Sequence, residues 1–260
     1  MWVVRGVDIF AFACLFFLLS YLIYIVYYAI GLYDLNPFLR PNPLNENEKK
    51  FLRERIARVR QLNGDDAHRF YKRVAWFRAK KAFLYKGLVN DKHTIELLIS
   101  GAGVLLTLGM NNYKYIRSVH KIVIYPTDYY SILNRKHHVG EYNRGLKTLV
   151  FAADSVEYGF KEEGDNINLA IHEFAHALYF ETNGRSSWES LRFQWGFKKL
   201  RAMKSLVKDT NYLRSYAQVN DFEFFSVLVE HFFETPEDLK RELPEAFELI
   251  ARMLNQKEMV

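Results

Sequence analysis

The hydrophobic pattern begins with one long apolar run. Ile9–Ile30 contains 22 consecutive positions without a charged side chain. At a rise of 1.5 Å per residue, a helix of this length would measure about 33 Å, enough to cross a hydrocarbon core of about 30 Å. The pattern therefore predicts one uncleaved N-terminal transmembrane helix, and residues 1–44 are assigned to this anchor and its linker. A buried core helix is the alternative.

Amphipathic and basic segments follow the apolar run. Lys49–Lys92 holds 14 basic and 4 acidic side chains, a net charge of +10. Asn45 and Glu48 have the spacing of a capping box, and apolar residues recur behind them at helical spacing. We therefore expect a basic helical region over residues 45–92 that either lies near anionic lipid head groups or forms a solvated surface. No nucleic-acid partner is expected, because no reader motif accompanies the charge.

The asymmetry of lysine and arginine predicts an orientation for the anchor. Only Arg5 precedes the apolar run, whereas Arg40, Lys49 and Lys50 are among the basic residues that follow it. Under the positive-inside rule, the larger part of the chain would lie in the cytoplasm. The sequence thus predicts a single-pass protein of the inner or cell membrane.

The remaining residues, 93–260, predict an α+β domain that is mostly helical and has a small sheet. Leu97–Tyr113 is uncharged but short for a membrane span, so we interpret it as a buried core helix. The runs Lys121–Tyr125 and Thr148–Ala153 are typical of strands. Thr127–Gly145 has the composition of a loop. Helical patterns occur at about residues 65–85, 165–180, 188–206, 220–235 and 236–254.

Composition narrows the candidate chemistry. Hydrophobic residues make up 50% of the chain and charged residues 25%, which indicates a folded protein with a sizeable core. The single cysteine, Cys14, excludes disulfide scaffolds, cysteine zinc fingers and iron–sulfur clusters. The glycine motifs of P-loop and dinucleotide-binding proteins are also missing from the sequence.

The most informative motif is HEFAH, which spans His172–His176. Two histidines four positions apart share one face of a helix, so their imidazole nitrogens can converge on one metal ion. Glu173 is turned about 100° from His172 on the same helix. It can therefore accept a proton from a water molecule and return it to a leaving amine. A pair of surface histidines on an amphipathic helix is the alternative.

A tetrahedral zinc site of this type needs a third protein ligand and one open position. Metzincins carry a glycine three positions and a third histidine six positions after the second histidine of the motif. This chain has Tyr179 and Thr182 at those positions, so the metzincin class is excluded. Glu223 is set among phenylalanines, which suits an inward carboxylate, but with Asn220 it also fits a capping box. The candidates for a carboxylate from a later segment are Glu181, Glu189, Asp209, Asp221, Glu223, Glu230 and Glu234.

Three segments together resemble the Mlc titration factor A peptidases, zincins whose catalytic domain is similar to that of anthrax lethal factor. These segments are His172–Leu178 (HEFAHAL), Tyr216–Phe225 (YAQVNDFEFF) and Glu230–Phe233 (EHFF). The resemblance covers roughly residues 90–255. It implies a zincin-like catalytic domain over residues 93–260, which the charge asymmetry would place on the cytoplasmic side of the membrane.

The resemblance also implies roles for five side chains. His172, His176 and Glu223 would bind one zinc ion per chain. Glu173 would be the catalytic acid and base, and Tyr216 would donate a hydrogen bond to the oxyanion. The expected function is a zinc-dependent metallopeptidase that hydrolyses peptide or protein substrates, with aminopeptidase-like action on short peptides. The alternative is an anchored zincin-fold protein that sequesters a transcriptional regulator with little catalysis.

Three further expectations accompany the resemblance. In zincins the strand before the active helix pairs with an extended substrate, so Leu149–Ala153 would be the edge strand. Glu230 shares a helix face with Glu223 and would either hold a histidine ligand or belong to an acidic surface stripe with Glu234. Tyr179 stands where family members often carry an acidic residue, which would alter the surroundings of His176.

Overall fold

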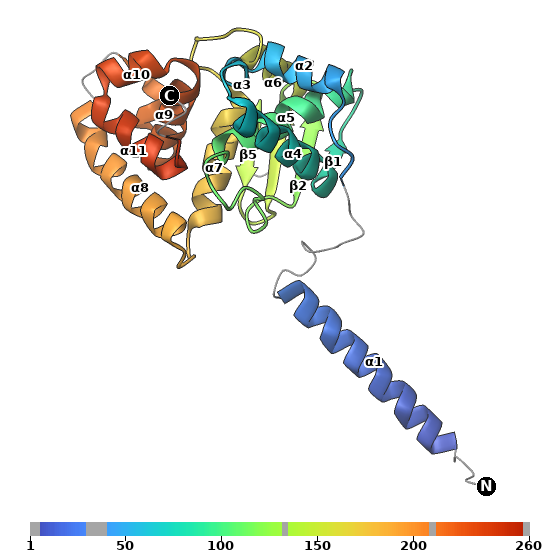
Figure 1. Cartoon of the computed structure of the whole chain (residues 1–260). Helices are drawn as coiled ribbons and strands as arrows, with labels where there is room; N and C mark the ends of the chain where they lie inside the picture. Colours follow the sequence, from blue (N-terminus) through green and yellow to red (C-terminus); the bar gives the residue numbers. More distant parts are fainter. Residues whose placement is uncertain (1–5, 30–40, 132–134, 208–211, 257–260) are drawn as a thin grey trace. The chain divides into compact units, whose positions relative to one another are not determined.

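The computed structural model describes residues 6–29, 41–131, 135–207 and 212–256 (Figure 1). The chain divides into two compact units, Met1–Pro41 and Asn42–Val260. The described part of the first unit is helix α1, Gly6–Ala29. Residues 30–40 of the predicted linker, Arg5 and Arg40 of the orientation argument, and the candidate ligand Asp209 lie outside the described residues.

The predicted membrane anchor is contradicted. A span needs about 20 predominantly apolar helical residues, because the hydrocarbon core is about 30 Å thick. Across the described ranges, no helix has both the length and the apolarity that crossing requires. The expectation of a single-pass membrane protein is therefore wrong.

The second unit begins with the basic helices α2 (Glu46–Arg55), α3 (Ala57–Arg60) and α4 (Gly64–Lys80). The predicted capping box is confirmed. The Glu48 amide donates to Asn45 Oδ1 at 2.9 Å, and the Asn45 amide donates to Glu48 Oε2 at 2.7 Å. Some of the basic side chains of this region form hydrogen bonds within the protein. Arg73, for example, donates to the backbone oxygens of Thr107 and Leu108.

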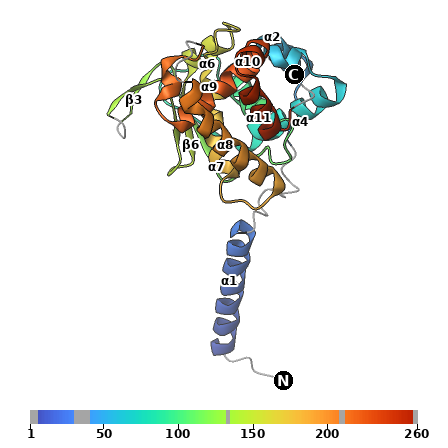
Figure 2. The ribbon, with the colours of Figure 1, turned by 90° about the vertical axis from the view of Figure 1, so that its left-hand side faces the viewer.

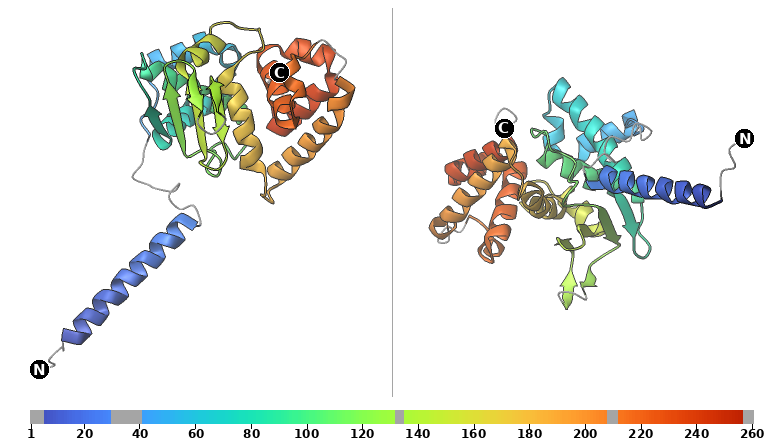
Figure 3. Two further views of the ribbon diagram at one scale, coloured as in Figure 1. Left: turned by 180° about the vertical axis from the view of Figure 1, so that it is seen from behind. Right: turned by 90° about the horizontal axis from the view of Figure 1, so that it is seen from below.

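The main sheet has the order β1-β2-β6-β5. Strands β1, β2 and β6 are parallel, and β5 pairs with β6 in the antiparallel sense. A separate antiparallel ribbon of β3 and β4 projects from the body of the unit (Figures 2 and 3). The strands are β1 Ala82–Tyr85, β2 Lys121–Tyr125, β3 Tyr129–Ser131, β4 Lys136–His138, β5 Gly140–Asn143 and β6 Thr148–Ala152.

Two strand predictions need correction. Leu149–Ala153 is not an edge strand, because β6 lies between β2 and β5. The edge beside the active helix is β5 instead. Thr127–Gly145, predicted as a loop, contains β3, β4 and β5. These strands are three or four residues long and rich in polar groups, so they lack the apolar alternation from which strands are predicted. Their hydrogen bonds to neighbouring strands define them.

Helices cover one face of the sheet and extend the unit beyond its β5 edge (Figures 1 and 3). The predicted core helix is confirmed as α5, although it ends at Leu106 rather than Tyr113. The remaining elements are α5 Lys92–Leu106, α6 Ala153–Gly159, α7 Leu169–Thr182, α8 Trp188–Val207, the 3-10 helix η2 Ser215–Gln218, α9 Asp221–Glu234, α10 Pro236–Glu242 and α11 Pro244–Leu254.

Helix α7 is anchored by Phe174, whose side chain is fully buried. Its ring lies 5.7 Å from that of Phe77 and 6.2 Å from that of Phe151, measured between centroids. A Cβ atom at Gly103 of α5 would approach Phe174 Cε1 to 2.8 Å, so this glycine permits the close contact of the two helices. Burying such a ring stabilises the fold by about 1.5–3 kcal/mol. The packing holds α7 in one position relative to the sheet.

Candidate metal centre

Helix α7 presents three polar side chains of the HEFAH motif from a mainly apolar helix. Asn168 begins this helix, because its side chain accepts a hydrogen bond from the Ile171 amide at 3.1 Å. His172 and His176 then lie one turn apart, and their Nε2 atoms are 3.2 Å from each other. The two imidazoles therefore converge, as the spacing predicted.

Helix α9 supplies the third group. Asn220 caps this helix by accepting hydrogen bonds from the amides of Phe222 and Glu223. The Glu223 side chain turns toward α7, where its Oε2 lies 2.9 Å from His172 Nε2 and 3.5 Å from His176 Nε2. Ligand atoms of the three residues all lie within 4.8 Å of one another. Two nitrogens and one carboxylate oxygen form the donor set that a catalytic zinc ion prefers.

The Nδ1 atom of each imidazole also has a polar contact. Glu230, with 1% of its surface exposed, accepts at Oε2 from His172 Nδ1 at 2.9 Å. The same carboxylate accepts from the Asn168 amide and is contacted by the Arg214 guanidinium. Ser226 Oγ lies 3.3 Å from His176 Nδ1. Such contacts direct the Nε2 atoms toward a common point and set which nitrogen carries the proton.

The electrostatics of the cluster favour a bound cation. Burial alone would raise the pKa of Glu223, but its contacts with the two imidazoles hold that pKa well below the usual range. Burial alone would lower the pKa of His172, but the carboxylates of Glu230 and Glu223 raise it to about 10. The carboxylates therefore stabilise positive charge between them, which is the requirement of a divalent metal site.

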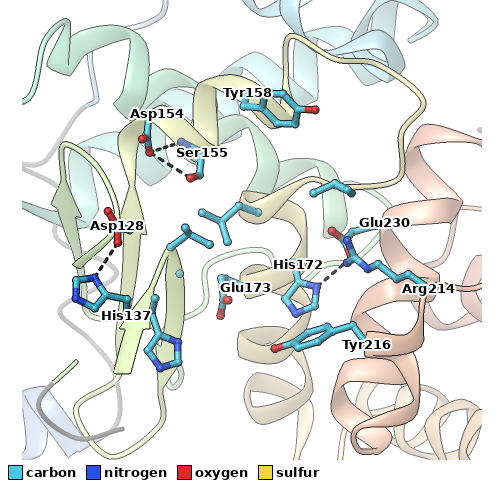
Figure 4. Close-up of a pocket in the computed structure, with 15 residues that line it drawn as sticks. Asp128, His137, Asp154, Ser155, Tyr158, His172, Glu173, Arg214, Tyr216 and Glu230 are labelled. Carbon is cyan, nitrogen blue, oxygen red and sulfur yellow. Dashed lines mark hydrogen bonds and ion pairs between the residues drawn. The ribbon is translucent and has the colours of Figure 1, made fainter. Parts of the chain in front are cut away.

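Glu173 faces the same space from the β5 side (Figure 4). Only 7% of its surface is exposed, and burial raises the pKa of its carboxyl group. A Cβ atom at Gly140 would lie 2.4 Å from Leu169 Cδ1 and 3.1 Å from Glu173 Oε1. The glycine thus lets the edge strand β5 approach α7 closely.

Tyr216, on η2, closes the other side. Its ring centroid is 5.9 Å from that of His172, and 49% of its surface is exposed. Burial of the hydroxyl, together with the charges of Glu223 and Glu173, raises the pKa of Tyr216 to about 12. The phenol therefore remains a hydrogen-bond donor at neutral pH.

A cavity of about 810 Å³ opens beside these groups (Figure 4). His172, Glu173 and Tyr216 lie at one end, and Asp128 and Asp154 line the other part. The volume is within the range of sites that bind small ligands or short peptide segments. The cluster is therefore accessible to a substrate rather than sealed inside the core.

A comparison with protein families decides how this arrangement is classified. The family model of the glucose-regulated metallo-peptidase M90 matches residues 36–254. The chain belongs to this family. The resemblance to Mlc titration factor A peptidases is thereby confirmed. A comparison with curated proteins found no match.

Membership in the M90 family has direct consequences for the chemistry. The protein is of the metallopeptidase type, and its substrates are peptides or proteins. A metal is implied, and among the described residues one group has the geometry to hold it, namely His172, His176 and Glu223. Among the acidic candidates that the structure describes, Glu223 is the one whose carboxylate lies near the Nε2 atoms of both histidines.

Two further candidates, Glu181 and Glu189, are engaged elsewhere in the fold. Glu181 accepts hydrogen bonds from the amides of Arg117 and Ser118, and Glu189 accepts one from the Asn111 amide. These contacts use both carboxylates to hold the loop that follows α5. Glu230 was expected either to hold a histidine or to belong to an acidic surface stripe with Glu234. It contacts His172 and is buried, so the surface stripe is excluded.

The contacts around the histidines include residues that sequence analysis did not identify. Asn168, Arg214 and Ser226 have no motif of their own, and their roles depend on packing alone. The Tyr179 ring packs on that of Phe222 at 4.9 Å between centroids. The contact beside His176 Nδ1 comes from Ser226 Oγ.

Proposed function

We propose that this protein is a single-zinc peptidase in which His172, His176 and Glu223 hold the metal. The observation that supports the proposal is the convergence of three ligand atoms within 4.8 Å, next to a buried glutamate and an open cavity. When bound, zinc would polarise a carbonyl group and lower the pKa of water toward about 7. Glu230 and Ser226 hold the two imidazoles in the orientation that this coordination requires.

Glu173 performs the proton transfers. Its carboxylate accepts a proton from the attacking water, and the resulting carboxylic acid returns that proton to the nitrogen of the departing amine. Burial suits both steps, because a raised pKa brings the carboxyl group closer to the pH at which it must accept and release a proton. No other carboxylate on α7 points into the cavity, within the residues described, since Glu181 is occupied elsewhere.

The substrate lies along β5. This strand is at the edge of the sheet and pairs with β6 on one side only, so its free main-chain groups can bind an extended peptide. Gly140 brings the strand close to Glu173, and Val139 and Gly140 both line the cavity. A peptide added to this edge would present its backbone carbonyl near Glu173 and Tyr216.

Replacement of Tyr216 by phenylalanine is expected to lower kcat about 10²–10³-fold, the effect of removing one oxyanion donor. The hydroxyl is a donor that interacts with negative charge developing on the carbonyl oxygen, so KM and metal content should change little. Steady-state kinetics and elemental analysis of Tyr216→Phe would test this. Since the phenyl ring keeps the packing against His172, a large loss of metal would contradict the assigned role.

The cavity also supports the aminopeptidase-like action implied by the resemblance. Asp128 and Asp154 line the part of the cavity away from the histidines, and two carboxylates there favour a free ammonium group. Short peptides should therefore be cleaved faster than their N-acetylated counterparts. Equal rates for the two forms would instead assign cleavage to internal bonds.

A peptide-library digest combined with metal analysis tests the proposal as a whole. The purified full chain should contain about one zinc per molecule and release new amino termini from the library. The family resemblance also left open a protein that sequesters a transcriptional regulator with little catalysis. Bound zinc without any cleavage would support that alternative and overturn the proposal of a peptidase.

A further inference from the structure

A second cavity, of about 280 Å³, lies on another side of the first turn of α7. Asn168 and Ile171 line it, whereas Leu169 and His172 line the larger cavity of the metal centre. Its other walls come from α3, from the end of α9 and from the loop between α6 and α7, drawn in yellow at the top of Figure 1. None of the five side chains proposed for metal binding and catalysis lines it.

Arg58, on α3, is the unusual feature of this cavity. Only 7% of its surface is exposed, and Nη1 donates to Gln61 Oε1 at 2.8 Å. The buried Nε and Nη2 atoms have no hydrogen-bond partner among the described residues. Leaving buried donors of a charged group unpaired is unfavourable, because their lost hydration is not compensated. These two atoms are the parallel donors of one edge of the guanidinium, which matches two oxygens of a carboxylate or phosphate.

The acidic groups nearby leave room for an anion. Glu163 is engaged by Arg60 at 2.5 Å, and Glu237 lies near enough to offset part of the buried charge of Arg58. Among the described residues, Glu234 Oε2 is buried without a hydrogen-bond partner. Burial, followed by the charges of Asp165 and Glu230, raises the pKa of Glu234 to about 8, so this carboxyl group takes up a proton more readily than an ordinary glutamate and can then donate a hydrogen bond.

We propose that this cavity binds a small oxyanion, a carboxylate or phosphate group, through Arg58 Nε and Nη2, with Glu234 as a further donor. The volume admits a small molecule rather than a folded partner. Arg55 also lines the cavity and adds positive charge. This site is separate from the metal centre, so its existence does not depend on the peptidase proposal.

The position of Asn168 relates this site to the metal centre. Its side-chain amide donates to the Gly159 oxygen at 2.8 Å, and its backbone amide donates to Glu230 Oε1 at 2.9 Å. Glu230 in turn holds His172 Nδ1. A bound anion would therefore lie next to the contacts that orient a proposed metal ligand.

Calorimetric titration of the full chain with inorganic phosphate and, separately, with succinate tests the proposal. At least one of the two should bind saturably and raise the thermal unfolding midpoint, and the better probe identifies the oxyanion class. Sodium chloride at matched ionic strength controls for general screening and should have no saturable effect. Absence of saturable binding by both probes would overturn the proposal.

Three variants locate the site. Arg58→Met removes both donors and should abolish binding, and Arg58→Lys keeps the charge but loses the paired donors, which should weaken binding by about tenfold or more. Arg53→Met, on an exposed residue of α2 outside the cavity, should bind as the wild type does. Circular dichroism would verify folding of each variant. Unchanged affinity in folded Arg58→Met or Arg58→Lys would show that the anion binds elsewhere.

Discussion

Replacement of Glu173 by glutamine is expected to abolish peptide hydrolysis while leaving the metal in place. Loss of a positioned general acid and base lowers a rate by about 10²–10⁴-fold, and here one carboxylate performs both transfers, so a loss near the upper end is expected. Glutamine has nearly the same shape and can occupy the space beside Gly140, but it cannot accept a proton from water. Single-turnover kinetics with a short peptide would measure the effect.

Metal content and a matched variant make this prediction specific. Glu173→Gln should retain the zinc content of the wild type, because Glu173 is not among the three converging ligand groups. Glu162→Gln, which alters an exposed carboxylate on the loop after α6, should keep full activity. A Glu173→Gln enzyme that cleaves at the wild-type rate would show that another group moves the protons.

The second large effect is expected from His176→Ala, which removes one of the three groups proposed to hold the metal. Loss of a group that merely orients a ligand weakens metal binding about 10–100-fold, and loss of the ligand itself should exceed this. The variant should therefore purify with little zinc and show no measurable hydrolysis. Elemental analysis reports the first result, and a peptide assay reports the second.

Thermal unfolding with a chelator provides a readout that does not depend on activity. A metal that binds only the folded chain stabilises it, so a chelator should lower the unfolding midpoint of the wild type. The same chelator should leave His176→Ala unchanged, because that variant holds little metal to remove. His68→Ala, on the exposed face of α4, serves as the matched control and should behave as the wild type. Full zinc content in His176→Ala would refute the proposed ligand set.

Helix-internal geometry explains what could be predicted for the metal centre. The four-residue spacing of His172 and His176 places both on one face whatever the rest of the chain does, because α-helical periodicity is local. The same local rules predicted the Asn45–Glu48 capping box and the buried character of α5, and both are confirmed. The family was also identifiable, since its motifs are contiguous segments.

Groups that meet across the fold were harder to predict. Glu223 was one of several acidic candidates, and only the packing of α9 against α7 brings its carboxylate 2.9 Å from His172. Arg214 and Ser226 carry no sequence signal, since a lone arginine or serine acquires its role from its neighbours. The prediction of a membrane anchor depended on one uncharged run, and it is contradicted because no described helix has both the length and the apolarity to span a membrane.

The sequence by itself determined the spacing of the two histidines, the position of Glu173 beside them and the family, because these depend on neighbours along one helix or one segment. Only the tertiary structure decided that β5 rather than β6 forms the edge of the sheet, and that Arg58 lies buried with two donors that no described residue accepts. The physical reason is that strand order and side-chain burial depend on contacts between residues far apart in sequence, which no local pattern contains.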